Sequence, residues 1–545
     1  MPSIDFHKVL KELLYNQKEP LLFNSGFFIW FFALFIITYS LVAKYRNARV
    51  ITFVLFSLYF FYKASGSFVW LVIFSAIVDF ILSNLIYRIT DKFKRKVLLI
   101  ISITLNLGML FYFKYTNFFI SLVNDFSHGS LHPLNLILPV GISFYTFENL
   151  SYTVDVYRGH FKPVTRFIDY LYFLSFFPKL MMGPIVRAAD FLPQLNKPYF
   201  VSKKDFATGF YLIFSGLFKK IVISDYINVN YVGYIFDDPS KHTGLECLLG
   251  VYGYALVIYC DFSGYSDMAI GIARWCGFNV PANFDSPYQS RSITEFWRRW
   301  HISLSSWLRD YLYIPLGGNR KGTFATYLFT AIFFIVSFFI SSHLFNLSFG
   351  WSAVVSGSLL LIFILPAIIK KQKSAIPTGF NLLTTMLIGG FWHGANWNFI
   401  IWGGMHGTAL SLDKAKEWIV SKMKFKTSGI FFKILAVLIT FNFVCFCWIF
   451  FRANSLSDSQ AMLHQIFSNF DLGVWKELFA SYPRVFIVIL IGFLLHFVSR
   501  RQEIKIKDFL EKLPLAGYLV IGFILFFIFI QIKTAEPVMP VYLQF

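Results

Sequence analysis

His393 is the residue whose surroundings most favour chemistry in this chain. It lies at the midpoint of residues 374–412, which contain no Asp, Glu, Lys or Arg, within the segment Gly389-Gly-Phe-Trp-His-Gly-Ala-Asn-Trp397. A histidine that far from any formal charge is expected at bilayer depth, where polar side chains are costly and usually mark a functional site. The other interpretation is a structural histidine that bonds a neighbouring helix. These residues alone leave both interpretations open.

General-base catalysis is the chemistry that such a histidine supports. Desolvation favours the neutral imidazole, which can accept a proton. A hydroxyl that attacks a thioester needs this help and little more, and a general base supplies about two to four orders of magnitude in rate. In a membrane, the donor and the acceptor can approach the same histidine from opposite sides of the bilayer.

Residues 276–320 form a second informative segment, because they are too polar to span a membrane and unusually rich in Trp. Ser292 and Glu295 have the spacing of a capping box. The sequence that follows predicts one amphipathic helix over 296–311, lying in the cytoplasmic membrane interface and ending near Pro315. Its apolar face would carry Trp297, Trp300, Leu304, Trp307, Leu308 and Tyr311, with Arg298, Arg299, Ser305, Ser306, Arg309 and Asp310 opposite.

His301 falls at the edge of that apolar face. It is either a solvated interfacial histidine without a chemical role or a side chain that points inward beneath the spans. In the second case the neighbouring arginines could hold an anionic phosphate donor, since guanidinium pairs well with phosphate oxygens. The candidate substrate-binding residues are Arg298, Arg299 and Trp300 here, and Trp392 and Asn396 beside His393.

The bulk composition is that of a multi-pass membrane protein. The chain is 57% hydrophobic and 14% charged, with 70 Phe, against about 25% charged residues in soluble domains. Its net charge of +20 comes from short basic clusters between apolar runs, which is the positive-inside pattern. A nucleic-acid partner is therefore not expected. The five cysteines lie in or beside apolar stretches without zinc-ligand spacing, so no metal is expected either.

The predicted fold is an all-α integral membrane protein, with roughly 12–14 helical segments. We expect interfacial and broken helices around a central catalytic channel. A single membrane domain covers 1–545, its core 135–455 includes the cytoplasmic interfacial segment 276–320, and 456–545 adds C-terminal helices. The apolar segments lie near 26–43, 49–63, 67–87, 97–113, 133–153, 168–185, 206–224, 245–272, 324–345, 350–369, 380–412 (broken into two), 430–451, 484–499 and 516–533.

Several other catalytic patterns are absent or weak. The chain has no Gly-x-Ser-x-Gly, no HExxH and no Walker-type phosphate loop, which excludes the usual signatures of serine esterases, zinc proteases and ATPases. Asp261 and Asp267 are six residues apart and do not share a helical face, so they favour helix–helix hydrogen bonding over a working carboxylate pair.

A series of segments resembles the membrane-bound O-acyltransferase (MBOAT) family, and most closely its bacterial alginate O-acetyltransferase branch. The resemblance covers about residues 135–455 and includes both histidine motifs. The segments are Pro139-Val-Gly-Ile-Ser-Phe-Tyr-Thr-Phe-Glu148, Asp155-Val-Tyr-Arg-Gly159, Gly183-Pro-Ile-Val-Arg187, Asp261-Phe-Ser-Gly-Tyr-Ser-Asp267, Phe296-Trp-Arg-Arg-Trp-His-Ile-Ser-Leu-Ser305, Phe391-Trp-His-Gly-Ala395, Trp448-Ile-Phe-Phe-Arg-Ala453 and the C-terminal Leu543-Gln-Phe545.

The resemblance implies a helical bundle in which funnels from both faces meet at the active site. His393 matches the family's catalytic histidine and His301 its second motif histidine, usually seen as supporting. It also implies a multi-pass protein of the bacterial inner membrane. The donor would be acetyl-CoA or another acyl thioester, and the acceptor an exported polysaccharide, often reached through an extracytoplasmic hydrolase-like acetyltransferase. Lys179 departs from the amide residue more usual at its position.

Alternatives to acetyl transfer remain at this level. Within the family, D-alanyl transfer to teichoic acid would use a carrier protein as donor. A glycan transporter or flippase belongs to a different class, although such folds usually show internal repeats and no repeat is found here. A third possibility is a catalytically silent scaffold for glycan export, which would tolerate loss of His393.

Overall fold

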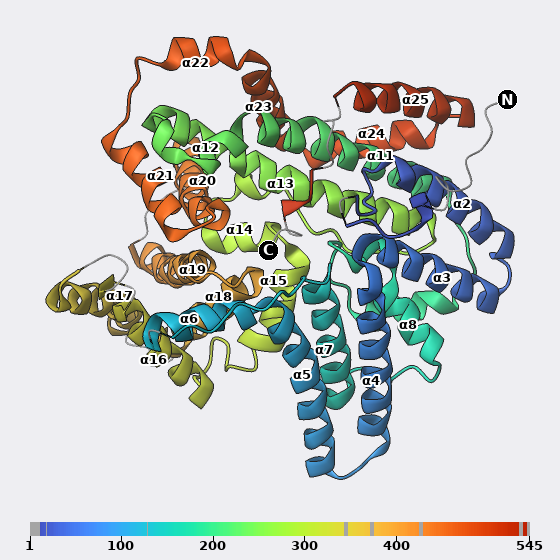
Figure 1. Ribbon diagram of the computed structural model, residues 1–545, viewed down its shortest axis with the longest axis horizontal. Coiled ribbons are helices and arrows are strands. Elements are labelled where there is room, and N and C mark those ends of the chain that lie inside the picture. Colours follow the sequence, from blue (N-terminus) through green and yellow to red (C-terminus); the bar gives the residue numbers. More distant parts are fainter. Residues whose placement is uncertain are drawn as a thin grey trace. The chain divides into compact units, whose positions relative to one another are not determined.

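A computed structural model describes residues 11–17, 19–127, 129–339, 341–342, 347–370, 375–423, 429–532 and 538–541 (Figure 1). Within these ranges the secondary structure is helical and contains no strand, as the sequence predicts. Contacts divide the chain into two compact units, described separately below. Unit 1 comprises 1–229, 256–282 and 487–545, and unit 2 comprises 230–255 and 283–486. The C-terminal segment 543–545 lies outside the described residues.

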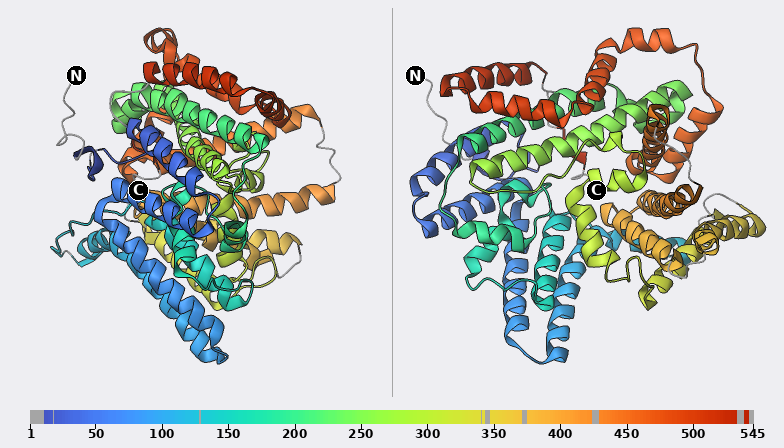
Figure 2. Two further views of the ribbon diagram at one scale, coloured as in Figure 1. Left: turned by 90° about the vertical axis from the view of Figure 1, so that its right-hand side faces the viewer. Right: turned by 180° about the vertical axis from the view of Figure 1, so that it is seen from behind.

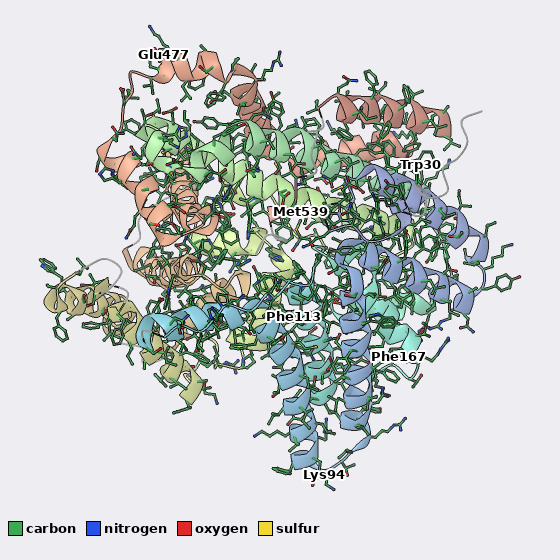
Figure 3. All side chains as sticks on the ribbon, in the orientation of Figure 1. Trp30, Lys94, Phe113, Phe167, Glu477 and Met539 are labelled. Carbon is green, nitrogen blue, oxygen red and sulfur yellow. The ribbon has the colours of Figure 1, made fainter. Side chains whose placement is uncertain are left out.

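Unit 1 begins with apolar helices joined by tight turns. Helices α4, α5 and α7 run side by side in Figure 1 and in the right-hand view of Figure 2. Lys94 lies near the end where α4 meets α5, and Phe113 lies toward the other end of α5 (Figure 3). The bounds are α2 Gly26–Val42, α3 Arg46–Ser65, α4 Val69–Arg88, α5 Lys92–Lys114, α6 Thr116–Ser127, α7 Ile142–Arg158, α8 Phe167–Ser175, α9 Phe177–Leu180 and α10 Ala188–Phe191.

A buried carboxylate ties three of these helices together. Asp79 on α4 is fully buried and accepts hydrogen bonds from Ser102 (2.5 Å) and Asn106 (2.7 Å) on α5 and from Thr153 (3.3 Å) on α7. An unpaired buried carboxylate would be costly, and these three neutral donors offset that cost. The polar groups inside the apolar helices therefore specify which helix faces meet.

Glycines allow α11 to approach the second half of α13 in unit 1. A Cβ atom at Gly216 would meet the carbonyl oxygen of Gly264, and the reverse also holds, so only small residues permit this contact. Lys219 lies 2.6 Å from Asp267 beside the contact. The bounds in this part are α11 Lys203–Leu217, the π-helical stretch η3 Phe218–Asp225, α13 Gly244–Trp275, α23 Pro483–His496, α24 Arg500–Glu511 and α25 Leu515–Ile532.

The last described residues of the chain are held by a buried cluster of charges. Lys220 lies 2.6 Å from Asp225 and 2.7 Å from Asp261. Its ammonium also donates to the carbonyl of Val538, and Asp261 accepts from the N–H of Val541 at 2.8 Å. Asp261 and Asp267 thus have separate lysine partners, which agrees with the expectation that they do not work as a pair.

Unit 2 contains both predicted histidine motifs. Its helices α18 and α19 form a hairpin, and α14 and α20 also pack against α19. The bounds in this unit are α12 Gly233–Asp237, α14 Ile293–Arg299, α15 Ile302–Leu308, the π-helical stretch η7 Arg309–Tyr313, α16 Phe324–Phe339, α17 Phe349–Lys370, α18 Ala375–His393, α19 Trp397–Met423, α20 Ile430–Arg452, α21 Leu456–Ser468 and α22 Trp475–Ser481.

Fewer helices meet the length of a membrane span than the apolar segments suggest. Within the described ranges six helical stretches are long and apolar enough, or seven if a bent pair counts as one span. Helices α2 and α16 are apolar but shorter than 18 residues. The six stretches are Arg46–Arg88, Lys92–Lys114, Lys203–Asp237, Gly244–Trp275, Ile430–Arg452 and Leu515–Ile532.

Two of the predicted helices differ from the structure, and a third contains the break that the sequence predicts. Residues 133–139 of the predicted helix 133–153 are not helical, and α7 begins only after Gly141, whose φ of 73° is left-handed. Residues 168–185 divide into α8 and α9, because Phe176 leaves the helical conformation and Pro178, which has no N–H to continue a helical ladder, lies in the first turn of α9. The break expected within 380–412 is confirmed, since α18 ends at His393 and α19 begins at Trp397.

The predicted single amphipathic helix over 296–311 is wrong. Ser292 caps α14 as the spacing indicates, by accepting from the N–H of Glu295. Helix α14 nevertheless ends at Arg299, and α15 starts after His301, whose backbone is left-handed. The apolar side chains expected to face a membrane interface are instead buried within unit 2. Their exposed fractions are 8% for Trp297, 1% for Trp300, 1% for Leu304, 8% for Trp307 and 3% for Leu308.

Candidate active site

His393 is the last residue of α18 and lies in an aromatic box. Its side chain is buried, with 4% of the residue exposed. Its ring centroid lies 5.0 Å from that of Trp392, 5.1 Å from that of Trp402 and 5.2 Å from that of Phe451. This setting excludes most water from the imidazole.

Glycines bring α18 and α19 close enough to form this box. A Cβ at Gly390 would meet the carbonyl oxygen of Phe399, and a Cβ at Gly403 would meet the carbonyl oxygen of Met386. A Cβ at Gly394, directly after His393, would likewise meet the ring of Phe399. The glycine-rich motif is therefore a packing requirement of the hairpin that carries the histidine.

Trp448 on α20 connects the two histidine motifs. Its ring centroid lies 5.0 Å from that of Trp300, the neighbour of His301, and 6.0 Å from that of Trp402, which contacts His393. Trp300, Trp402 and Trp448 are each at most 1% exposed. The structure thus brings segments about a hundred residues apart in sequence into one buried aromatic cluster of unit 2.

His301 points inward, which excludes the solvated interfacial interpretation. The residue is fully buried, and burial lowers the pKa of its imidazole from 6.5 to about 3. It lies outside the candidate spans. At neutral pH, His301 is therefore an uncharged imidazole inside the protein and can act as a hydrogen-bond donor on one nitrogen and an acceptor on the other.

The candidate substrate-binding residues have different positions. Arg298 is exposed, whereas Arg299 lies 2.8 Å from Glu295 and also donates to the carbonyl of Asp285. Trp300 is part of the aromatic cluster. Trp392 is 4% exposed and packs against His393. Arg298 is consequently better placed than Arg299 to meet an anion arriving from solvent.

Asn396 has a structural position that the sequence did not indicate. Its amide nitrogen donates to the carbonyl of Asn454 at 3.1 Å, and its amide oxygen accepts from the N–H of Asn398. Asn398 in turn donates to the carbonyls of Ala453 and Ser455. The two amides fasten the turn after α18 to the end of α20, which fixes Phe451 against His393.

Two further polar residues belong to this region: His406, which the sequence shows only as a polar residue inside an apolar run, and Asn283, which no sequence pattern indicated. His406 is fully buried on α19 and accepts the indole N–H of Trp297 on its Nδ1 at 3.3 Å. Asn283, just before the Trp-rich segment, lies 3.2 Å from Nδ1 of His301. A histidine in an apolar helix was visible at 406, but nothing in the sequence paired it with Trp297, or Asn283 with His301, because these contacts are long-range.

Comparisons with known proteins show which family the chain resembles. Residues 159–340 match the MBOAT, membrane-bound O-acyltransferase family. The chain is 32% identical to the peptidoglycan O-acetyltransferase of Helicobacter pylori over 81% of its own length and 79% of that protein. It is 37% identical to the probable alginate O-acetylase AlgI of Pseudomonas putida, over 69% of its own length and 65% of that protein.

A further relative, matched over a smaller share of the chain, is named for a different acyl transfer. It is 30% identical to the teichoic acid D-alanyltransferase of Bacillus subtilis, over 59% of its own length and 70% of that protein. Both kinds of relative are named for the transfer of an acyl group. This chain is an acyltransferase enzyme and belongs to the membrane-bound O-acyltransferase family.

Proposed function

We propose that the protein moves an acetyl group from a cytoplasmic thioester to a hydroxyl of an exported or cell-wall polysaccharide, with His393 as the general base. The observation that carries this proposal is the burial of both histidine motifs at one aromatic cluster in a membrane protein. The likeness to proteins named peptidoglycan O-acetyltransferase and probable alginate O-acetylase supports acetyl as the transferred group and a polysaccharide as the acceptor.

The reaction requires one proton transfer in each direction. The acceptor hydroxyl oxygen attacks the thioester carbonyl carbon while its proton passes to the imidazole of His393. The new C–O bond forms, the C–S bond breaks, and the proton returns from the imidazolium to the leaving thiolate. The aromatic walls formed by Trp392, Trp402 and Phe451 keep water from competing with the hydroxyl for the same carbonyl.

Arg298 is the proposed contact for the phosphate groups of a coenzyme A donor. It is exposed and lies on the same short helix, α14, as Trp297. The ring of Trp297 contacts Trp402 in the aromatic cluster. Replacement by Ala would weaken donor binding and raise KM for acetyl-CoA while kcat changes little, because a phosphate contact is made equally in the ground and transition states. Arg299→Ala would have the smaller effect, since Glu295 already pairs with its guanidinium.

The proposed location is the bacterial inner membrane, where the donor is cytoplasmic and the acceptor lies outside. A hydrolase-like acetyltransferase on the outer side would be the partner that passes the acetyl group to the polymer. The closest competing function is D-alanyl transfer to teichoic acid from a carrier protein. The smaller share of the chain covered by the D-alanyltransferase relative favours acetyl transfer.

The decisive experiment measures O-acetylation of exported glycan in cells that express wild-type protein or the His393→Ala or His301→Ala variant at equal membrane levels. Loss of acetylation with His393→Ala and a smaller loss with His301→Ala would support the assignments. His464→Ala is the matched control, because that histidine is exposed on α21. It should leave acetylation at the wild-type level.

The alternatives give different results. Unchanged acetylation with His393→Ala would reject His393 as the general base and favour the hypothesis of a transporter or of a scaffold. A transporter also has no reason to consume acetyl-CoA, so thioester turnover by the purified wild-type protein separates the two classes. Feeding radiolabelled acetyl donors or D-alanine, and asking which label reaches the cell wall, distinguishes the two acyl groups.

A further inference from the structure

The side-chain oxygen of Asn283 is the acceptor of three hydrogen bonds from one short turn. It lies 3.2 Å from Nδ1 of His301, and it accepts from the backbone N–H of Ser303 at 3.2 Å and from the hydroxyl of Ser303 at 2.9 Å. The backbone carbonyl of Asn283 also accepts from the N–H of Ile302 at 2.9 Å. One asparagine, only 1% exposed, therefore holds three consecutive residues.

These contacts determine which nitrogen of His301 carries a proton. The backbone N–H of Ser303 can only donate, so the atom of Asn283 that it meets must be the amide oxygen, which has no hydrogen to give. The Nδ1 of His301 must then be the donor in its contact with the same oxygen. Because burial keeps the imidazole neutral, Nε2 is the unprotonated nitrogen.

The backbone at His301 gives an independent sign of constraint. Its φ of 41° and ψ of 56° place it in the left-handed region, which residues with a side chain seldom adopt. Such conformations persist where the surroundings enforce them, and they gather at functional sites. The bonds from Ile302 and Ser303 to Asn283 are the restraints that hold this turn.

We infer that Asn283 is a positioning residue for acyl transfer. It fixes His301 in the Nδ1–H tautomer and in the left-handed turn, so that Nε2 accepts a hydrogen bond from a group that takes part in the reaction. This inference rests on the proposed acyl transfer, and it assigns His301 a specific atom and a specific orienting partner.

The test compares two substitutions of similar size in the purified full-length protein, with acetyl-CoA as the donor. Asn283→Leu removes the acceptor, and Asn283→Asp retains it. We expect Asn283→Leu to lower kcat per folded molecule by about tenfold to a hundredfold, with KM for acetyl-CoA nearly unchanged. Asn283→Asp should recover most of kcat when assayed at mildly alkaline pH, where the added charge least favours a protonated imidazole.

Asn381→Leu is the matched control. Asn381 is another fully buried asparagine of unit 2, and its side chain also makes three hydrogen bonds, to Gly318, Lys321 and Thr326. Its loss should reduce the amount of folded protein while kcat per folded molecule stays near the wild-type value. Wild-type kcat in folded Asn283→Leu protein would overturn the inference, whereas a wild-type protein without any acyl transfer would overturn the proposed function instead.

A second pair of variants covers the case in which Asn283→Leu does not fold. The amide oxygen of His301→Gln can reach the place of Nε2, whereas that of His301→Asn stops near the place of Nδ1. We expect His301→Gln to retain more turnover per folded molecule than His301→Asn. Asparagine tolerates the left-handed conformation better, so a lower turnover in His301→Asn cannot be caused by strain in the turn. Equal or higher turnover in His301→Asn would reject Nε2 as the acting atom.

Discussion

The indole of Trp297 donates its N–H to Nδ1 of His406 at 3.3 Å, which joins two residues 109 positions apart. Because an indole nitrogen can only donate, Nδ1 is the acceptor and the proton of the neutral imidazole is on Nε2. The His406 ring also lies 4.8 Å from Trp402, which contacts His393. His406 therefore contacts two tryptophans of the aromatic cluster around the proposed base, Trp297 through this bond and Trp402 through its ring.

Two replacements of His406 should differ in stability because of this bond. The amide oxygen of His406→Asn lies near the place of Nδ1 and still accepts from Trp297, whereas that of His406→Gln lies nearer Nε2. A buried N–H without an acceptor costs about 1–3 kcal/mol, so the Gln variant should unfold at the lower temperature. Thermal unfolding in detergent measures the difference, and combining either variant with Trp297→Phe should abolish it.

The contact between α18 and α19 should tolerate alanine at only one of two adjacent glycines. Gly403→Ala places a methyl group against the carbonyl of Met386, and overpacking costs about 1–3 kcal/mol. Gly404→Ala is the control, because its nearest neighbour, a ring carbon of Phe333, lies 3.5 Å away. We expect loss of folded protein and of acetylation in the first variant only, measured by membrane level and glycan acetate. Equal behaviour of the two would contradict the packing argument.

The stability of the protein should fall in mild acid partly because of His301. Its pKa is 6.5 when unfolded and about 3 when folded. Between these values only the unfolded state binds the proton, so stability is complete above pH 6.5 and is lost as the pH falls toward 3, by at most about 1.4 kcal/mol per pH unit. His301→Asn removes the titration. Its unfolding temperature should depend less on pH below 6.5 than that of wild type, and parallel curves would reject this prediction.

Lys179 and Glu148 form a buried ion pair in unit 1. Removing one partner leaves the other charged and buried, which costs about 3–5 kcal/mol. Lys179→Met and Glu148→Leu should each destabilise the protein strongly, and the double variant should recover much of the loss. Lys507→Ala is the control, because the Lys507–Glu503 pair is partly exposed and such pairs contribute at most about 1 kcal/mol. Additive losses in the thermal unfolding of the double variant would contradict this account.

The sequence by itself determined the class of the protein and its two histidine motifs. Membrane helices need long runs of apolar residues, so composition and spacing predict an all-α membrane protein. The break after His393 was also visible, because Gly394 and the polar Asn396 interrupt an apolar run. Local sequence patterns were sufficient to predict these features, because run length and helix-breaking residues act locally.

Only the tertiary structure decided how these motifs work together. A helical periodicity places the tryptophans of 296–311 on one face but cannot distinguish a membrane interface from a protein interior, since both are apolar. The left-handed turn at His301 is hydrogen-bonded to Asn283, eighteen residues earlier. The partners of Trp297 and Trp300 come from α19 and α20, more than a hundred residues later. Long-range packing and hydrogen bonds set these relationships, and a local pattern carries no information about which distant residue will be the partner.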